Sequence, residues 1–246
     1  MRIGRGRATL LAAVLAAAAC SGGIFRQYEY EEDVYLSLDG SATVYVNASV
    51  AAIDALRGAA FDASPSATFD RDAFRRYYSS PATHVTRVSS SRRSGRRFVH
   101  VRMEVDDIRR LPADPPFAWS AYDFARRGEL FEYRQTIGAA AAKPVADAGW
   151  TGREIVAFRL HLPSKIAWHN APPGNLKRGN ILVWEQPLAD RLRGVPLTLE
   201  ARMETQSILY RTLWLFGATF VAVALSFGVV IWWILRRAPA AHAGAP

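Results

Sequence analysis

The residue types that most often carry catalysis are scattered along this sequence of 246 residues and form no catalytic motif. It has no glycine-rich phosphate loop, no HExxH zinc motif and no GxSxG nucleophile motif. Its histidines on or beside expected strands lack the short spacing of a metal site; they are His84, His100, His161 and His169. We therefore expect no enzyme, no catalytic residue, no metal and no cofactor. The alternative is a hydrolase whose reacting groups meet only in the fold.

Four arginines flank one expected hairpin tip at Ser94-Gly95, and they are Arg92, Arg93, Arg96 and Arg97. Their guanidinium groups would form a positive patch able to meet anionic lipid headgroups or an acidic polymer. We treat them as candidate ligand-binding residues. The alternative is a loop whose charges are simply solvated.

Acidic residues cluster near the start of the first expected strand, at Glu29, Glu31, Glu32 and Asp33. Such a cluster can bind a cation. We favour a structural role, in which the charges solvate the beginning of an edge strand and prevent unwanted pairing.

Two tryptophans lie in the most distinctive stretch, residues 168–188 (WHNAPPGNLKRGNILVWEQPL). In one interpretation Trp168 and Trp184 form the rim of a pocket and stack on a ligand. In the other, which we favour, the stretch is a long hairpin loop followed by an aromatic core strand.

The first 20 residues have the form of an export signal. Arg2, Arg5 and Arg7 precede an uncharged run, Ala8–Ala19, that is too short to span a bilayer. Small residues before the lone Cys20 resemble a lipobox, although Ala17 stands where leucine is usual. We expect lipidation at Cys20; the alternative is ordinary cleavage after the alanine run. A single cysteine also excludes an intramolecular disulfide.

A second apolar segment, residues 208–235, predicts one transmembrane helix. No residue from Thr212 to Leu235 is charged, and tryptophans stand near both ends of this run. Arg236-Arg237 follows at once. By the positive-inside rule, residues 236–246 form a cytoplasmic tail and residues 21–207 a domain outside the cytoplasm.

The net charge of +9 belongs mostly to these two ends. Six of the 31 basic residues lie in the signal, the helix and the tail, whereas all 22 acidic residues lie between Glu29 and Glu204. The domain is therefore only weakly basic, and we expect no nucleic-acid partner.

The remaining pattern alternates apolar and polar residues in short segments, which is typical of strands. Expected strands are 28–38, 42–48, 84–90, 98–105, 119–125, 130–137, 154–162, 166–168, 180–185 and 195–204; expected helices are 50–56 and 70–78, with shorter turns at 106–111 and 187–192. This order predicts an α+β domain with an antiparallel, strongly curved sheet and two or three short helices.

The sequence resembles the LppM-type lipoprotein domains of bacterial envelopes. The resemblance rests on the early hairpin 33–48 (DVYLSLDGSATVYVNA) with its following helix, on Gly179-Asn180 before Val183-Trp184, and on the two membrane-directed ends. It implies an envelope-tethered α+β domain with a curved sheet suited to a lipid-like ligand and without an assigned enzymatic activity.

We therefore expect a membrane-anchored, extracytoplasmic, non-enzymatic module that binds membrane lipid or another amphiphile. The alternative is a protein-interaction subunit of an envelope complex.

Overall fold

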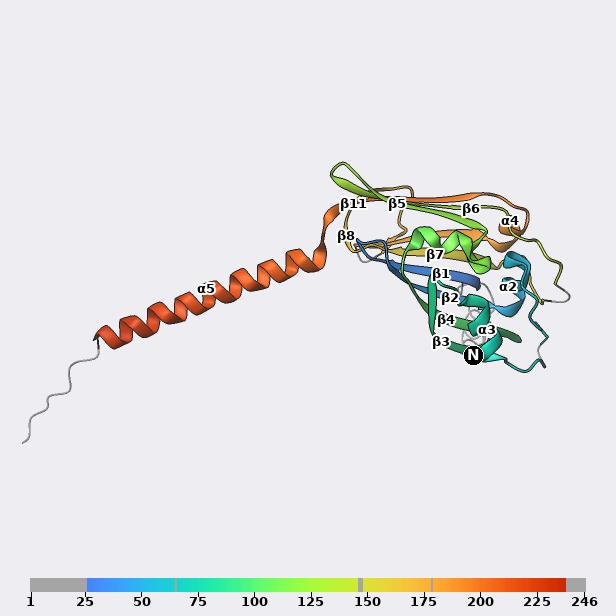
Figure 1. Ribbon diagram of the computed structural model, residues 1–246, viewed down its shortest axis with the longest axis horizontal. Coiled ribbons are helices and arrows are strands. Elements are labelled where there is room, and N and C mark those ends of the chain that lie inside the picture. Colours follow the sequence, from blue (N-terminus) through green and yellow to red (C-terminus); the bar gives the residue numbers. More distant parts are fainter. Residues whose placement is uncertain (1–25, 65, 146–147, 178, 238–246) are drawn as a thin grey trace, which may run out of the picture.

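The chain folds into two β-sheets that share one hydrophobic core, with a long helix projecting from one end (Figure 1). The computed structural model describes residues 26–64, 66–145, 148–177 and 179–237. The signal segment, Cys20 and the last nine residues lie outside these ranges, so lipidation at Cys20 stays a prediction.

The seven-stranded sheet has the order β3 (Thr83–Arg93), β4 (Arg96–Val105), β2 (Ala42–Ser49), β1 (Tyr28–Leu36), β7 (Ile155–His161), β10 (Ile181–Pro187) and β9 (Leu176–Lys177). The four-stranded sheet has the order β5 (Ser120–Arg127), β6 (Leu130–Ile137), β11 (Leu197–Ser207) and β8 (Ser164–His169). The mixed α+β class is confirmed. The expectation of one antiparallel sheet is wrong, because there are two sheets and β1 pairs in parallel with β7. Strong curvature stays a prediction.

The helices are α2 (Val50–Arg57), α3 (Arg71–Tyr78), α4 (Leu188–Leu192) and α5 (Ile208–Arg237), with 3-10 turns η1 (Ile108–Ala113) and η2 (Pro115–Phe117). The expected helix 50–56 is present as α2, and both of its ends are capped. The Ser49 hydroxyl accepts from the backbone N–H of Ala52 at 3.1 Å, and Gly58 ends the helix at φ 71°.

The acidic cluster at the start of β1 does not lie on an edge strand, so that expectation is wrong. β1 is central, between β2 and β7, and the side chains of Glu29 and Glu32 are fully buried. Arg96 pairs with Glu29 at 2.8 Å and Arg57 with Glu32 at 2.7 Å. The two carboxylates are therefore parts of the core.

The carboxylate of Glu32 accepts further hydrogen bonds from Tyr30 at 2.8 Å, Tyr122 at 2.9 Å and Gln135 at 3.0 Å. The Arg57 guanidinium also lies over the rings of Tyr30, Phe117 and Trp119 at 4.7–5.1 Å. Tyr122 and Gln135 come from the four-stranded sheet, so this polar centre links the two sheets.

Strand directions place the two ends of the domain. The backbone N–H of Ile208, the first residue of α5, donates to Pro163, just beyond the end of β7. β7 is parallel to β1, and β1 and β4 both run antiparallel to β2, so β4 begins at the end of the sheet opposite to the end of β7. The hairpin turn between β3 and β4 lies at that opposite end. The tip at Ser94-Gly95 therefore points away from the start of α5.

Candidate functional site: the surface around Trp168

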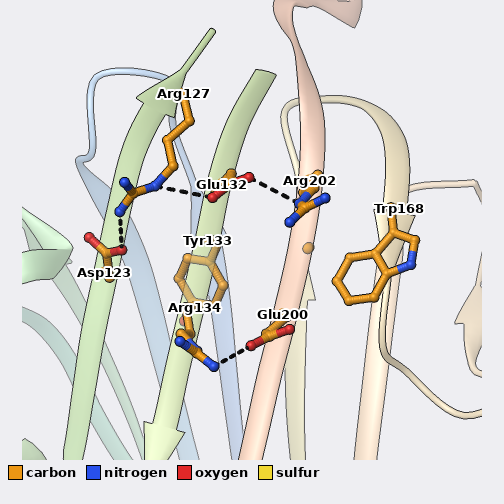
Figure 2. Close-up of a pocket in the computed structure, with 9 residues that line it drawn as sticks. Asp123, Arg127, Glu132, Tyr133, Arg134, Trp168, Glu200 and Arg202 are labelled. Atoms are coloured by element: carbon orange, nitrogen blue, oxygen red, sulfur yellow. Dashed lines mark hydrogen bonds and ion pairs between the residues drawn. The ribbon is translucent and has the colours of Figure 1, made fainter. Parts of the chain in front are cut away.

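The outer face of the four-stranded sheet carries charged side chains on adjacent strands. Alternation along β5, β6 and β11 buries every second residue, such as Tyr133 and Ala201, and turns its neighbours outward. A hollow of about 410 Å³ lies on this face. Its walls are Asp123, Arg127, Glu132, Tyr133, Arg134, Trp168, Glu200, Ala201 and Arg202 (Figure 2).

Ion pairs hold these charges in a defined pattern (Figure 2). Arg127 contacts Asp123 at 3.2 Å and Glu132 at 3.1 Å. Glu132 accepts from Arg202 at 3.0 Å. On the next row, Arg134 pairs with Glu200 at 2.8 Å. Exposed pairs of this kind contribute little to stability, about 0–1 kcal/mol each, so their main effect is to fix where charge of each sign is displayed.

Trp168 stands at the edge of this pattern and separates two hollows. Its ring lies under the Arg202 guanidinium at 5.3 Å, and the side chain is 45% exposed. A second hollow of about 500 Å³ follows β8 and is lined by Lys165, Ile166, Ala167, Trp168, His169, Leu176 and Gly179. It separates β8, the last strand of the four-stranded sheet, from β9, the last strand of the seven-stranded sheet.

The structure does not bring the two candidate tryptophans into one exposed site. Trp184 lies on β10, is 3% exposed, and donates its indole N–H to Asn170 at 3.0 Å. The interpretation of this segment as an aromatic core strand therefore describes Trp184, whereas Trp168 fits the interpretation as a pocket rim.

The four candidate arginines lie in strands and not in a loop, because β3 and β4 extend up to a two-residue turn. Ser94 and Gly95 have φ angles of 50° and 75°, as a tight hairpin turn requires. Arg96 pairs with the buried Glu29, and Arg97 is itself buried. Arg93 lies over the Phe98 ring at 4.2 Å. Arg92 and Arg93 are exposed, so the surface patch is smaller than the sequence suggests.

Sequence reasoning missed the ion-paired side chains beside Trp168, which we call the charged ladder. They are Asp123, Arg127, Glu132, Arg134, Glu200 and Arg202. The signal of the charged ladder was the alternation of charged and apolar residues in the expected strands 130–137 and 195–204. That alternation shows an exposed face, but it does not show which strands lie side by side. Among the described residues, no group of three or more His, Cys, Asp or Glu side chains is placed to hold a metal ion.

The strand that carries Glu200 and Arg202 leads directly into α5. β11 ends at Ser207 and α5 begins at Ile208. Arg211, in the first turns of α5, pairs with Glu204, which also contacts Lys165 at 3.6 Å. Helix α5 is long and apolar enough to cross a membrane, which agrees with the predicted span.

A solved structure with a similar fold covers much of this chain. It is the folded domain of LppM from Mycobacterium tuberculosis, determined by NMR. The TM-score is 0.42 and the sequence identity 16%, over 75% of this chain and 94% of that domain. This is the family that the sequence resembles, but a match at this level does not place the chain within it. No protein-family model and no curated protein matches the sequence.

Proposed function

We propose that this chain is a membrane-anchored recognition module that faces out of the cytoplasm and binds a partner protein through the surface around Trp168. The observation that carries the proposal is that β11, whose Glu200 and Arg202 belong to the charged ladder, runs without a linker into α5. Arg202 precedes Ile208 by six positions, which is about 20 Å of strand. The surface would thus be held at a fixed height above the membrane.

The partner chemistry follows from the edge strand β8. An edge strand presents unpaired backbone groups, to which an extended segment of another protein can add. The hollow beside β8 offers that segment exposed apolar contacts at Trp168 and at Leu176, which is 43% exposed. Tryptophan and arginine dominate binding energy in many interfaces, and here Trp168 and Arg202 are in contact. We therefore favour an extended, polar segment with an apolar anchor.

An amphiphile is the second candidate, and one observation favours it. The same hollow combines Ile166, Trp168 and Leu176 with Lys165. Apolar walls with a cation at the rim suit an acyl chain with an anionic head. The charged ladder gives this candidate less support, because its positive and negative groups alternate.

Photo-crosslinking in native membranes tests the proposal. The photoreactive residue p-benzoylphenylalanine replaces Trp168 in the full chain, and in a matched control it replaces Tyr35. Tyr35 is equally exposed, at 44%, but lies on the seven-stranded sheet. We expect one protein adduct of defined mass from position 168 and none from position 35. Leu176→Asp, which places a charge on the facing wall, should abolish the adduct.

Three outcomes would count against the proposal. Equal adducts from both positions would show unspecific proximity. An adduct unaffected by Leu176→Asp would place the contact outside the hollow. Adducts with lipid alone would favour the amphiphile.

A further inference from the structure

Three side chains on adjacent strands of the seven-stranded sheet form a hydrogen-bonded chain on its solvent face. The Ser91 hydroxyl on β3 lies 2.8 Å from His100 Nε2 on β4. His100 Nδ1 lies 3.0 Å from Asn47 Oδ1 on β2. Register explains the contact, because His100 pairs directly with Asn47 and with Ser89, and Ser91 is the next outward residue after Ser89.

The order serine, histidine, acceptor is the arrangement that activates a hydroxyl nucleophile. If Asn47 Oδ1 accepts the Nδ1–H proton, His100 Nε2 carries a free lone pair directed at the Ser91 hydroxyl. The ring can then take the hydroxyl proton, while Asn47 holds its orientation. Ser91 is exposed, so an incoming group can reach it.

The surroundings of His100 supply room and positive charge. A hollow of about 230 Å³ adjoins the ring and is lined by Tyr45, Asn47, Arg87, Ser89, His100, Val101 and Arg102. Ser91 does not line this hollow. Register pairs Arg87 with Arg102 and Ser91 with Phe98, so the two arginines lie on the side of His100 away from Ser91. Arg102 is held over the Tyr45 ring at 5.6 Å.

The protonation state of His100 suits a base. Partial burial lowers the pKa of the imidazole below its usual value; Glu31 raises that pKa and Arg93 lowers it. The ring is thus neutral at neutral pH, as proton abstraction requires.

We propose that Ser91 is a nucleophile activated by His100 and positioned through Asn47, and that it takes the acyl group of small carboxylic esters. The Ser91 oxygen bonds to the ester carbonyl carbon, and His100 Nε2 receives the hydroxyl proton. That proton passes to the departing alcohol as its bond to the carbonyl breaks. Water then cleaves the serine ester, giving a carboxylic acid and free Ser91. This inference is independent of the Trp168 surface.

The test uses the full chain in detergent micelles with two probes. A fluorophosphonate reports labelling of Ser91 by peptide mass spectrometry, and p-nitrophenyl acetate reports turnover. We expect labelling at Ser91 and not at Ser89, its outward neighbour. Ser91→Ala should abolish turnover, whereas Ser90→Ala, at an exposed serine of the same strand, should leave it unchanged. A general base typically contributes about 100-fold or more, so His100→Gln should slow both reactions by that factor.

Two further readouts separate activation from a structural role. Asn47→Asp keeps an acceptor and should retain the rate, whereas Asn47→Leu should lose it. The rate should rise with pH through a midpoint below 6.5, the usual imidazole value. Equal labelling of Ser89, no labelling at all, or a rate that does not respond to His100→Gln in a folded variant would overturn the proposal.

Discussion

Replacing Glu32 with alanine removes the carboxylate that faces the Arg57 guanidinium in the centre of the domain. Both side chains are at most 1% exposed, so water does not take the place of the lost group. The variant would leave a buried positive charge without its partner. It would also leave the Tyr30 and Tyr122 hydroxyls and the Gln135 amide without their acceptor.

The largest part of the expected loss in the free energy of unfolding comes from the ion pair. Removing one partner of a buried pair costs about 3–5 kcal/mol, because the other charge remains desolvated. Each neutral donor left unsatisfied costs about 1–3 kcal/mol more, although relaxation around the gap reduces that sum. Since domains are stable by about 5–15 kcal/mol, Glu32→Ala should bring this one close to its unfolding threshold.

Chemical unfolding of the full chain in detergent, followed by circular dichroism at a pH above the Glu32 pKa of about 7 so that both partners are charged, measures the effect. The matched control is the double variant Glu32→Leu with Arg57→Met, which removes both charges and keeps their volume. It should be more stable than Glu32→Ala, because no unpaired charge remains. A loss below about 1 kcal/mol for Glu32→Ala, or a double variant less stable than the single one, would refute this account.

Three further predictions concern the same fold. Burial raises the pKa of Glu32 to about 7 from its usual 4.5, while hydrogen bonds from Tyr122 and Gln135 lower it. Between these values the folded state keeps a proton that the unfolded state has lost. The free energy of unfolding should therefore fall as pH rises through this range, by at most about 3 kcal/mol. The Arg57 guanidinium favours the charged carboxylate and so makes the fall smaller than this limit. A pH series comparing the wild type with Glu32→Gln isolates this slope, and identical slopes would contradict it. Gly58→Ala should cost about 1–2 kcal/mol in thermal or chemical unfolding, because φ is 71° and the new Cβ would lie 3.3 Å from Ala141; an unchanged stability would show that the cap relaxes. Trp168→Ala should change stability by less than about 0.5 kcal/mol, and a larger loss would assign Trp168 a structural role.

Much of the fold could be predicted because it depends on local signals. Strand alternation, the Ser49 cap and Gly58 each act within a few residues, and all are present in the structure. The expected helix at 70–78 begins after Asp70, whose side chain accepts from the backbone of Ala73 at 2.9 Å. Local chemistry was enough to place these elements.

Strand pairing could not be predicted, because it joins segments far apart in the chain. β1 pairs with β7, more than a hundred residues later, and this pairing makes β1 central. Its acidic residues were therefore expected on a solvated edge, whereas Glu32 lies in the core and contacts Arg57 from α2. The contact between Ser91 and His100 was missed for a different reason, because the expected strand 84–90 stopped short of Ser91, whereas β3 extends to Arg93.

The uninterrupted passage from β11 into α5 also sets how the domain bears mechanical load. If α5 spans a membrane, a partner that pulls the domain away from that membrane would stretch the chain along the axis of β11. That strand is hydrogen-bonded on both sides, to β6 and to β8. Because these bonds lie across the strand direction, the load shears both ladders together and does not open them one bond at a time. The proposed attachment to a membrane would thus be made through a strand that resists extraction.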